Sequence, residues 1–324
     1  MSITQNSIKQ HEISALHELE QMMLAAKENI GESRSELEKS VTNLENCLQQ
    51  IRQKYILDEK QCAMEAFRQQ FESGYTWING LLRNVERFGN REALAEPESG
   101  KVWTYTQLNA EANRFAHALL RSGLQKGDVV MAQLHNCPEF VFAYLACHKI
   151  GLVFCPVNFR LSAKELSGCM DNSCPKVFLM ESENQENTDM ALEWAEHAPE
   201  IILSTDSQSE HSYEKFADGC PETNPELPWD MYVFDETLRL FTSGTTGRQK
   251  SVCLTSINEV LSAHDVMINF PLSFTDRTMN TTPWFHRGGL HSGGITPTLY
   301  AGGTVVVQRK FQAEQTLDCI EQQG

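Results

Sequence analysis

The 324-residue chain lacks the features of a secreted, membrane-spanning or nucleic-acid-binding protein. Its first twelve residues, MSITQNSIKQHE, contain no apolar signal region, so they do not direct the chain to secretion. The longest apolar stretch, residues 139–157, is interrupted by His148, Lys149 and Gly151 and is typical of a buried helix followed by a buried strand, not of a membrane span. No basic patch indicates nucleic acid. We therefore expect a cytoplasmic protein.

Paired cysteines are also missing. The chain has ten cysteines but no CxxC pair, and the closest two, Cys169 and Cys174, do not fit a zinc-binding pattern. In an intracellular chain such residues are reduced, buried and small. The cysteines therefore predict neither a metal site nor a disulfide framework.

Basic residues are scarce in one segment. Residues 181–236 hold 16 Asp and Glu against one Lys and no Arg, a net charge of −15 out of −16 for the whole chain. The acidity is therefore a property of this segment and not of the fold. We interpret the segment as a solvated, variable surface region; an acidic interaction surface is the alternative.

Residues 1–73 carry two apolar seams that are typical of helices packed on helices. The phase changes at NIGESRSE, where Gly31 suits a helix end and Ser33 with Glu36 suits a capping box. We predict a helical hairpin; one coiled coil with a stutter is the alternative. Residues 10–72 could join copies of the chain, or Met64, Phe67 and Phe71 could pack on the next domain. The seams are Leu16, Leu19, Met23, Ala26 and Ile30, and then Leu37, Val41, Leu44, Leu48, Ile51 and Tyr55.

Beyond Gly74, strand and helix patterns alternate and predict an α/β fold of mostly parallel sheets covered by helices. We divide it into a first α/β half at 74–180, the acidic segment at 181–236 and a second, truncated α/β half at 237–324. A helix is expected at 138–150, with Pro138 at its first position. The expected strands are VWTY, VVMAQL, LVFCPV, KVFLM, LRLFT and TVVVQ. The expected capping boxes are Ser162 with Glu165 and Ser256 with Glu259, and the last helix should bury Leu317 and Ile320.

The sequence LFTSGTTGRQKSV at 240–252 predicts a phosphate-binding loop between a strand and a helix. Glycines let backbone N–H groups turn inward as a nest, hydroxyl groups add donors, and Lys250 adds a positive charge. A flexible linker is the plain alternative. The P-loop pattern GxxxxGK[ST] is a poorer match, because Gln249 stands where a glycine is needed and the downstream strand ends in Gln308 instead of an acid.

The segment FTSGTTGRQK closely resembles the phosphate-binding signature of the adenylate-forming superfamily, (Y/F)TSGTTGxPKGV. Three further segments resemble the same family: WTYTQLNAEANRFAHALLRSGLQKGDVV, HKIGLVFCPVNFRL and PWFHRGGLHSGGITPTLYAGGTVVV. The last is similar to acyl- and aryl-CoA synthetases. The resemblance covers residues 75–324 and omits the helical N-terminus. Gln249 replaces the usual proline and Ser251 the usual glycine, which could lower the rate.

The resemblance implies an ATP-dependent acid–thiol ligase that uses Mg²⁺ and coenzyme A, with fatty acid metabolism as an expected context. A small carboxylic acid is joined to AMP and then transferred to the CoA thiol. Lys250 and His286 would be catalytic, and His286 would lie between the acid and the phosphates. The phosphate cradle implied is Thr242, Ser243, Gly244, Thr245, Thr246, Gly247 and Lys250, and the substrate pocket is Trp284, Phe285, His286, Gly288 and Gly289.

The blocks that the family places further along are not found before Gly324. They include an aromatic-Gly-x-Thr-Glu block, a ribose-binding aspartate and a C-terminal catalytic lysine. We therefore expect the chain to be the front part of a ligase and to be inactive alone. The alternative is a non-catalytic module that binds a nucleotide or a partner and assembles through its helical hairpin.

Overall fold

A computed structural model describes residue 21 and residues 34–242 and 250–323. Backbone contacts divide the chain into two compact units, Met1–Gln70 and Phe71–Gly324, which we describe separately.

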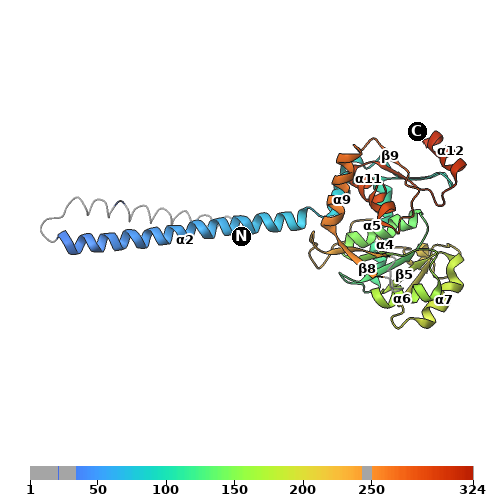
Figure 1. Ribbon diagram of the computed structural model, residues 1–324, viewed down its shortest axis with the longest axis horizontal. Coiled ribbons are helices and arrows are strands. Elements are labelled where there is room, and N and C mark those ends of the chain that lie inside the picture. Colours follow the sequence, from blue (N-terminus) through green and yellow to red (C-terminus); the bar gives the residue numbers. More distant parts are fainter. Residues whose placement is uncertain (1–20, 22–33, 243–249, 324) are drawn as a thin grey trace. The chain divides into compact units, whose positions relative to one another are not determined.

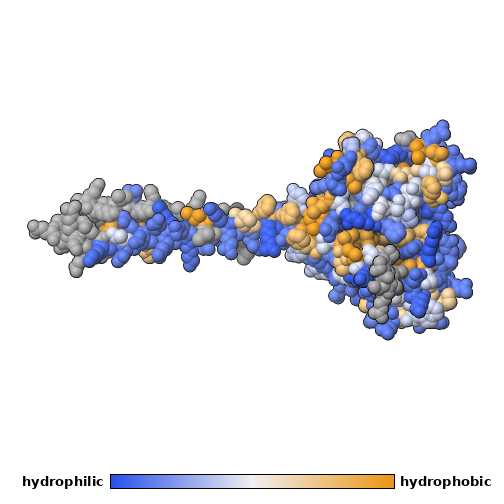
Figure 2. Space-filling view, in the orientation of Figure 1, coloured by the Kyte–Doolittle hydropathy of each residue, from blue (hydrophilic) through white to orange (hydrophobic). Residues whose placement is uncertain are grey.

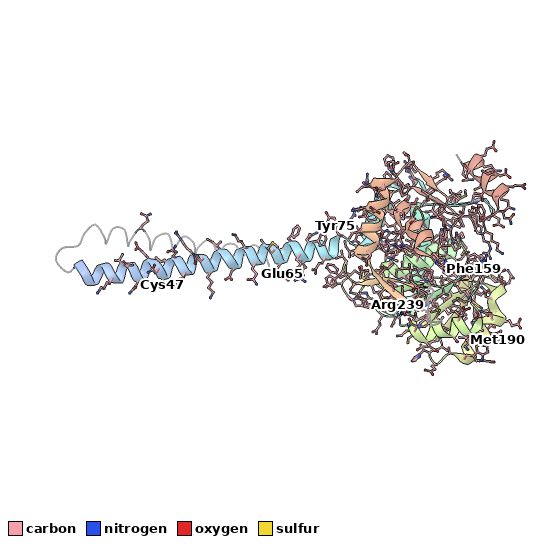
Figure 3. The ribbon with its side chains drawn as sticks, in the orientation of Figure 1. Cys47, Glu65, Tyr75, Phe159, Met190 and Arg239 are labelled. Atoms are coloured by element: carbon pink, nitrogen blue, oxygen red, sulfur yellow. The ribbon has the colours of Figure 1, made fainter. Side chains whose placement is uncertain are left out.

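Beyond residue 21, the described structure of the first unit belongs to the helix α2 (Arg34–Gly74), whose last residues are counted with the second unit. Cys47 and Glu65 project from α2 with exposed side chains (Figure 3). Val41 is buried, whereas Met64 and Phe67 are about two-thirds exposed. The predicted first helix, its Gly31 turn and Ser33 lie outside the described residues, so the predicted cap of Ser33 with Glu36 is not tested. The hairpin and the coiled coil therefore stay predictions.

The second unit is built on two sheets covered by helices (Figure 1). One sheet has the strand order β2-β1-β10-β9 and the other the order β6-β5-β3-β4-β7-β8. The first comprises β1 (Glu92–Glu96), β2 (Lys101–Thr104), β9 (Arg277–Thr278) and β10 (Thr304–Val306). The second comprises β3 (Val129–Gln133), β4 (Val153–Pro156), β5 (Val177–Met180), β6 (Ile201–Ser204), β7 (Glu236–Thr242) and β8 (Lys250–Thr255).

Most strand pairs are parallel, which confirms the predicted fold class. The antiparallel pairs are β1–β2 and β7–β8. Parallel strands are connected by helices that cover the sheet faces. The helices are α3 (Trp77–Phe88), α4 (Tyr105–Arg121), α5 (Pro138–Ile150), α6 (Ala163–Ser173), the 3-10 helix η1 (Ser182–Asn184), α7 (Gln185–Trp194), α8 (Tyr213–Phe216), α9 (Ser256–Asn269), α10 (Arg287–His291), α11 (Ile295–Ala301) and α12 (Ala313–Gln323).

The helix α5 lies at the centre of the core, and its bounds are those predicted. Twelve of its 13 residues are buried, so its apolar residues surround the whole helix instead of forming a stripe. Pro138 occupies the first turn, where no N–H is required, and Gly151 ends the helix with a left-handed φ of 74°. The predicted capping box of Ser162 with Glu165 on α6 is also confirmed.

The acidic segment 181–236 includes regular structure. The strand β6 pairs in parallel with β5 at one edge of the six-stranded sheet, and η1, α7 and α8 flank it. The segment thus completes an edge of the sheet while most of its acidic side chains remain at the surface.

The phosphate-loop segment differs from the expected strand–loop–helix order. The loop joins two antiparallel strands, β7 and β8, and α9 begins only after β8. The expected cap is also wrong. The Asn258 side chain accepts hydrogen bonds from Thr255 at 2.9 Å, whereas Ser256 and Glu259 are buried. Glu259 does not cap the helix, because its carboxylate is bound by Thr237, Tyr144 and His148.

The prediction that α12 buries Leu317 and Ile320 is wrong. These side chains are 66% and 54% exposed, and Thr316 is the buried residue of this helix. Figure 2 shows apolar surface over α9 and α12. The apolar pattern formed the helix, but no described segment covers that face.

Across the described ranges, with their gaps at 1–20, 22–33, 243–249 and 324, no helix has the length and apolarity needed to traverse a membrane.

Candidate functional site

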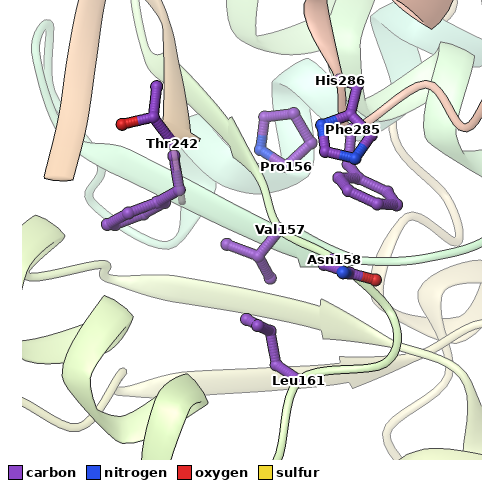
Figure 4. Close-up of a pocket in the computed structure, with 8 residues that line it drawn as sticks. Pro156, Val157, Asn158, Leu161, Thr242, Phe285 and His286 are labelled. Carbon is purple, nitrogen blue, oxygen red and sulfur yellow. The ribbon is translucent and has the colours of Figure 1, made fainter. Parts of the chain in front are cut away.

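A small cavity of about 110 Å³ opens at the carboxyl ends of β4 and β7, and His286, the N-cap of α10 (Arg287–His291), lines it (Figure 4). In parallel α/β sheets this end of the strands is where ligands bind. Parallel pairing of Phe154 with Leu238 brings the ends of β4 and β7 together. The cavity is lined by Pro156, Val157, Asn158, Leu161, Phe241, Thr242, Phe285 and His286.

Three residues predicted from the sequence meet at this cavity: Thr242 from the end of β7, and Phe285 and His286 from the segment before α10. The Phe285 ring lies 4.1 Å from the His286 ring and 5.6 Å from that of Phe159, measured between centroids. Partial burial lowers the pKa of the His286 imidazole below its ordinary value. The neutral ring, with one donor and one acceptor nitrogen, is therefore favoured at neutral pH.

The predicted phosphate loop begins at this cavity. Thr242 pairs with Lys250 across β7 and β8, and the Thr242 hydroxyl donates to the Lys250 carbonyl oxygen at 3.4 Å. Lys250, the first residue of β8, is exposed and therefore accessible to an anion. Ser243, Gly244, Thr245, Thr246 and Gly247 lie outside the described residues.

Trp284 does not line the cavity. It is buried, its ring packs on Phe140 at 5.6 Å, and its backbone N–H donates to the Asn136 side-chain oxygen at 2.9 Å. These contacts fix the chain immediately before Phe285 and His286. Trp284 therefore supports the wall of the cavity from behind.

The two predicted glycines have different surroundings. A Cβ atom at Gly289 would lie 2.2 Å from the Pro283 carbonyl oxygen, so only glycine fits there. A Cβ atom at Gly288 would meet nothing closer than 3.8 Å, at Thr282. Gly289 permits the tight turn that presents His286, whereas Gly288 has room for a small side chain.

Sequence reasoning assigned no role to five residues of the lining: Pro156, Val157, Asn158, Leu161 and Phe241. The first four lie in the segment HKIGLVFCPVNFRL, and Phe241 is the first residue of FTSGTTGRQK. The topology could have identified them, because β4 and β7 are parallel and the residues at their carboxyl ends therefore lie at the same edge of the sheet.

One described cluster offers three ligand atoms to a metal: His135, Glu181 and Glu183. Arg309, however, donates to the Glu181 carboxylate at 2.7 Å, and His135 Nδ1 lies 2.6 Å from the other carboxylate oxygen. The guanidinium group already supplies the positive charge that a metal would bring. We therefore interpret the cluster as an ion-pair network. The His135 ring stacks on that of Phe159, with 3.9 Å between their centroids.

Comparison with known proteins agrees with this geometry. The family model described as AMP-binding enzyme matches residues 81–324. An indoleacetate–CoA ligase of Aromatoleum aromaticum is 32% identical over 249 residues, which is 76% of this chain and 47% of the relative. A feruloyl-CoA synthase of an Amycolatopsis species is 29% identical over 231 residues, 71% of this chain and 44% of the relative.

Solved structures share the fold. ATP-bound MatB from Rhodopseudomonas palustris has a TM-score of 0.65 at 26% identity, covering 75% of this chain and 48% of its own. The anthranilate CoA ligase AuaEII, solved with anthranoyl-AMP, has a TM-score of 0.70 at 22% identity, covering 76% of this chain and 48% of its own. The chain spans about half the length of the curated relatives it matches. The cavity, the loop segment and the matched residues lead to one conclusion: the chain belongs to the AMP-binding enzyme family.

Proposed function

We propose that this chain is the N-terminal part of an ATP-dependent carboxylate–CoA ligase that acts in the cytoplasm. The observation that carries the proposal is the meeting of Thr242, at the start of the loop, with Phe285 and His286 in one cavity. The family match and the CoA ligases among the relatives support it.

The proposed reaction has two steps. A carboxylate oxygen attacks the α-phosphorus of ATP, the bond to the bridging oxygen breaks, and pyrophosphate leaves. The CoA thiolate then attacks the acyl carbon and AMP leaves. We assign Thr242, Ser243, Gly244, Thr245, Thr246, Gly247 and Lys250 to the β- and γ-phosphates. Negative charge that builds on phosphate oxygens in the first step is stabilised by these N–H, hydroxyl and ammonium donors.

The neutral His286 ring is proposed to orient the acid at the cavity. It lies next to Phe285, on an apolar lining completed by Val157, Leu161 and Phe241. An apolar wall suits the body of an aryl or acyl acid while the carboxylate points toward the loop.

Magnesium is expected with ATP. The lining offers oxygen atoms from Asn158 and Thr242 but no carboxylate, which is the protein ligand that Mg²⁺ prefers. The described lining is therefore not a magnesium site by itself.

The test is carboxylate-dependent ATP–pyrophosphate exchange by the whole protein that contains this chain, screened against a panel of carboxylic acids. Lys250→Ala should lower exchange at least about tenfold, equivalent to roughly 1.4 kcal/mol. Lys101→Ala, a change of the same kind on the exposed end of β2, should leave it unchanged. Unchanged exchange in the Lys250 variant, or ATP hydrolysis that needs no carboxylic acid, would contradict the proposal.

For the first unit we propose a helical hairpin over residues 1–73, with residues 10–72 able to join copies of the chain. Light scattering of the chain with and without residues 1–73 tests this. A mass that is a multiple of the monomer only when the segment is present supports oligomerisation. A monomeric mass with and without the segment refutes oligomerisation through it.

A further inference from the structure

The carboxylate of Glu259 on α9 is fully buried. It accepts a hydrogen bond from the Thr237 hydroxyl at 3.0 Å and another from the Tyr144 hydroxyl at 2.7 Å. The His148 imidazole, itself 1% exposed, binds the same carboxylate through Nε2. A buried carboxylate is stable only when donors and positive charge surround it.

The hydrogen bonds of His148 fix where its protons lie. Its Nδ1 atom is 2.8 Å from the Tyr144 carbonyl oxygen, and a carbonyl oxygen only accepts. Nδ1 therefore carries a proton. Its Nε2 atom faces the Glu259 oxygen, and two lone pairs cannot meet at hydrogen-bond distance without a proton between them. The geometry thus requires a second proton, shared by Nε2 and the carboxylate.

The surroundings favour the charged form of Glu259. Burial alone would raise the pKa of the Glu259 carboxyl, but the charge and hydrogen bond of His148, with a contribution from His291, hold it below its ordinary value. Burial and the nearby carboxylate raise the pKa of the Tyr144 hydroxyl, which therefore stays a donor. His291 Nε2 lies 3.7 Å from the carboxylate, within ion-pair range but beyond a hydrogen bond.

The elements joined by this carboxylate are those that carry the cavity. Thr237 lies on β7, the strand that ends at Thr242. His291 is the last residue of α10, the helix that His286 precedes as its N-cap. Both are linked through Glu259 to His148 on the buried helix α5. One carboxylate therefore has contacts to both segments that carry predicted site residues.

We propose that Glu259 and His148 share a buried proton at neutral pH, and that this pair positions β7 and α10, and through them Thr242 and His286. Glu259 and His148 are positioning residues, since neither lines the cavity. The shared proton does not depend on the proposed function, whereas a catalytic consequence of the positioning does.

The first arm of the test observes the proton. In the chain labelled with ¹⁵N-histidine, His148 should show protons on both ring nitrogens at neutral pH. Glu259→Gln should remove the proton from Nε2, because an amide cannot balance a buried imidazolium charge. Glu165→Gln, a change of an exposed capping carboxylate, is the control and should have no effect. A bare Nε2 or a bare Nδ1 in the unchanged chain would overturn the proposal.

The second arm observes the positioning. A double variant, Glu259→Met with His148→Met, removes both charges together and should fold, because apolar replacement of a buried ion pair is often tolerated. Its amide signals for Thr242 and His286 should nevertheless shift from those of the unchanged chain. Unchanged signals at both residues would refute the positioning role. No nucleotide is present in either arm, so a failure here is distinct from a failure of the ligase proposal.

Discussion

The helices α5 and α12 are of similar length, but their surroundings are opposite. Twelve of the 13 residues of α5 are buried, whereas Thr316 is the buried residue of the 11-residue α12. The apolar residues of α5 surround the whole helix, whereas those of α12, among them Leu317 and Ile320, stand among polar residues. The comparison shows that an apolar pattern specifies a helix with an apolar face. Whether that face is buried depends on what the rest of the chain packs against it.

The helix α5 also packs against the elements that form the cavity. Phe140 on α5 packs against Phe154 at 5.1 Å and against Trp284 at 5.6 Å, which places it behind both β4 and the segment leading to His286. A change in α5 should therefore affect folding and the cavity together, whereas a change in α12 should affect neither.

The largest effect is expected from Leu145→Ala on α5. Leu145 is fully buried, so the change removes apolar contact and leaves a cavity, at a cost of about 2–5 kcal/mol in the free energy of unfolding. Urea unfolding followed by circular dichroism measures it. A cost below about 1 kcal/mol would show that α5 is not packed as described.

The next effect is expected at the turn before His286. Gly289→Ala would bring a Cβ atom to 2.2 Å from a backbone oxygen, so the turn must shift, at about 1–3 kcal/mol or more. Gly288→Ala is the matched control and should be nearly neutral, because its Cβ would have room. Equal costs at the two positions would contradict the arrangement of α10.

Acid should lower the stability of the fold partly through the buried carboxylates of Glu181 and Glu259. Burial would raise the pKa of the Glu181 carboxyl, but His135 and Arg309 lower it overall, as His148 does for Glu259. A lowered carboxyl pKa stabilises the fold above the unfolded value of about 4.3, and this stabilisation is lost as the pH falls below it. Glu181→Gln should therefore flatten the loss of melting temperature between about pH 5 and pH 3. An unchanged slope would exclude Glu181 as a contributor.

The smallest effect is expected from Leu317→Ala on α12, the same chemical change as at Leu145. Because this side chain is 66% exposed, the free energy of unfolding should change by less than about 0.5 kcal/mol. A cost similar to that of Leu145→Ala would mean that the α12 face is covered after all, and the contrast between the two helices would disappear.

The local signals of α5 were readable in the sequence. Pro138 marks the start of the helix through its own backbone restriction, and the helix spans the predicted residues 138–150. For α12 the pattern gave the helix correctly, but exposure is set by residues outside the pattern. The capping box on α9 failed because the Glu259 partners, Tyr144 and His148, are more than a hundred residues away in the sequence.

The same limit applies to the candidate site. Thr242, Phe285 and His286 were identified through their resemblance to family motifs, and the structure places them together. Val157 and Leu161 were missed, because their place in the cavity depends on the pairing of β4 with β7, which joins residues 84 positions apart. Spacing along the chain does not report such a contact.

The central proposal is that the loop from Thr242 to Lys250, which begins at the cavity, binds the phosphates of ATP, and it can be tested by titrating Mg·ATP into the ¹⁵N-labelled protein. The account predicts that the amide signals of Thr242, Lys250 and His286 shift together with a single dissociation constant. Shifts confined to the surface beside α12, at Gln312 and Gln315, with these three signals unmoved, would contradict it.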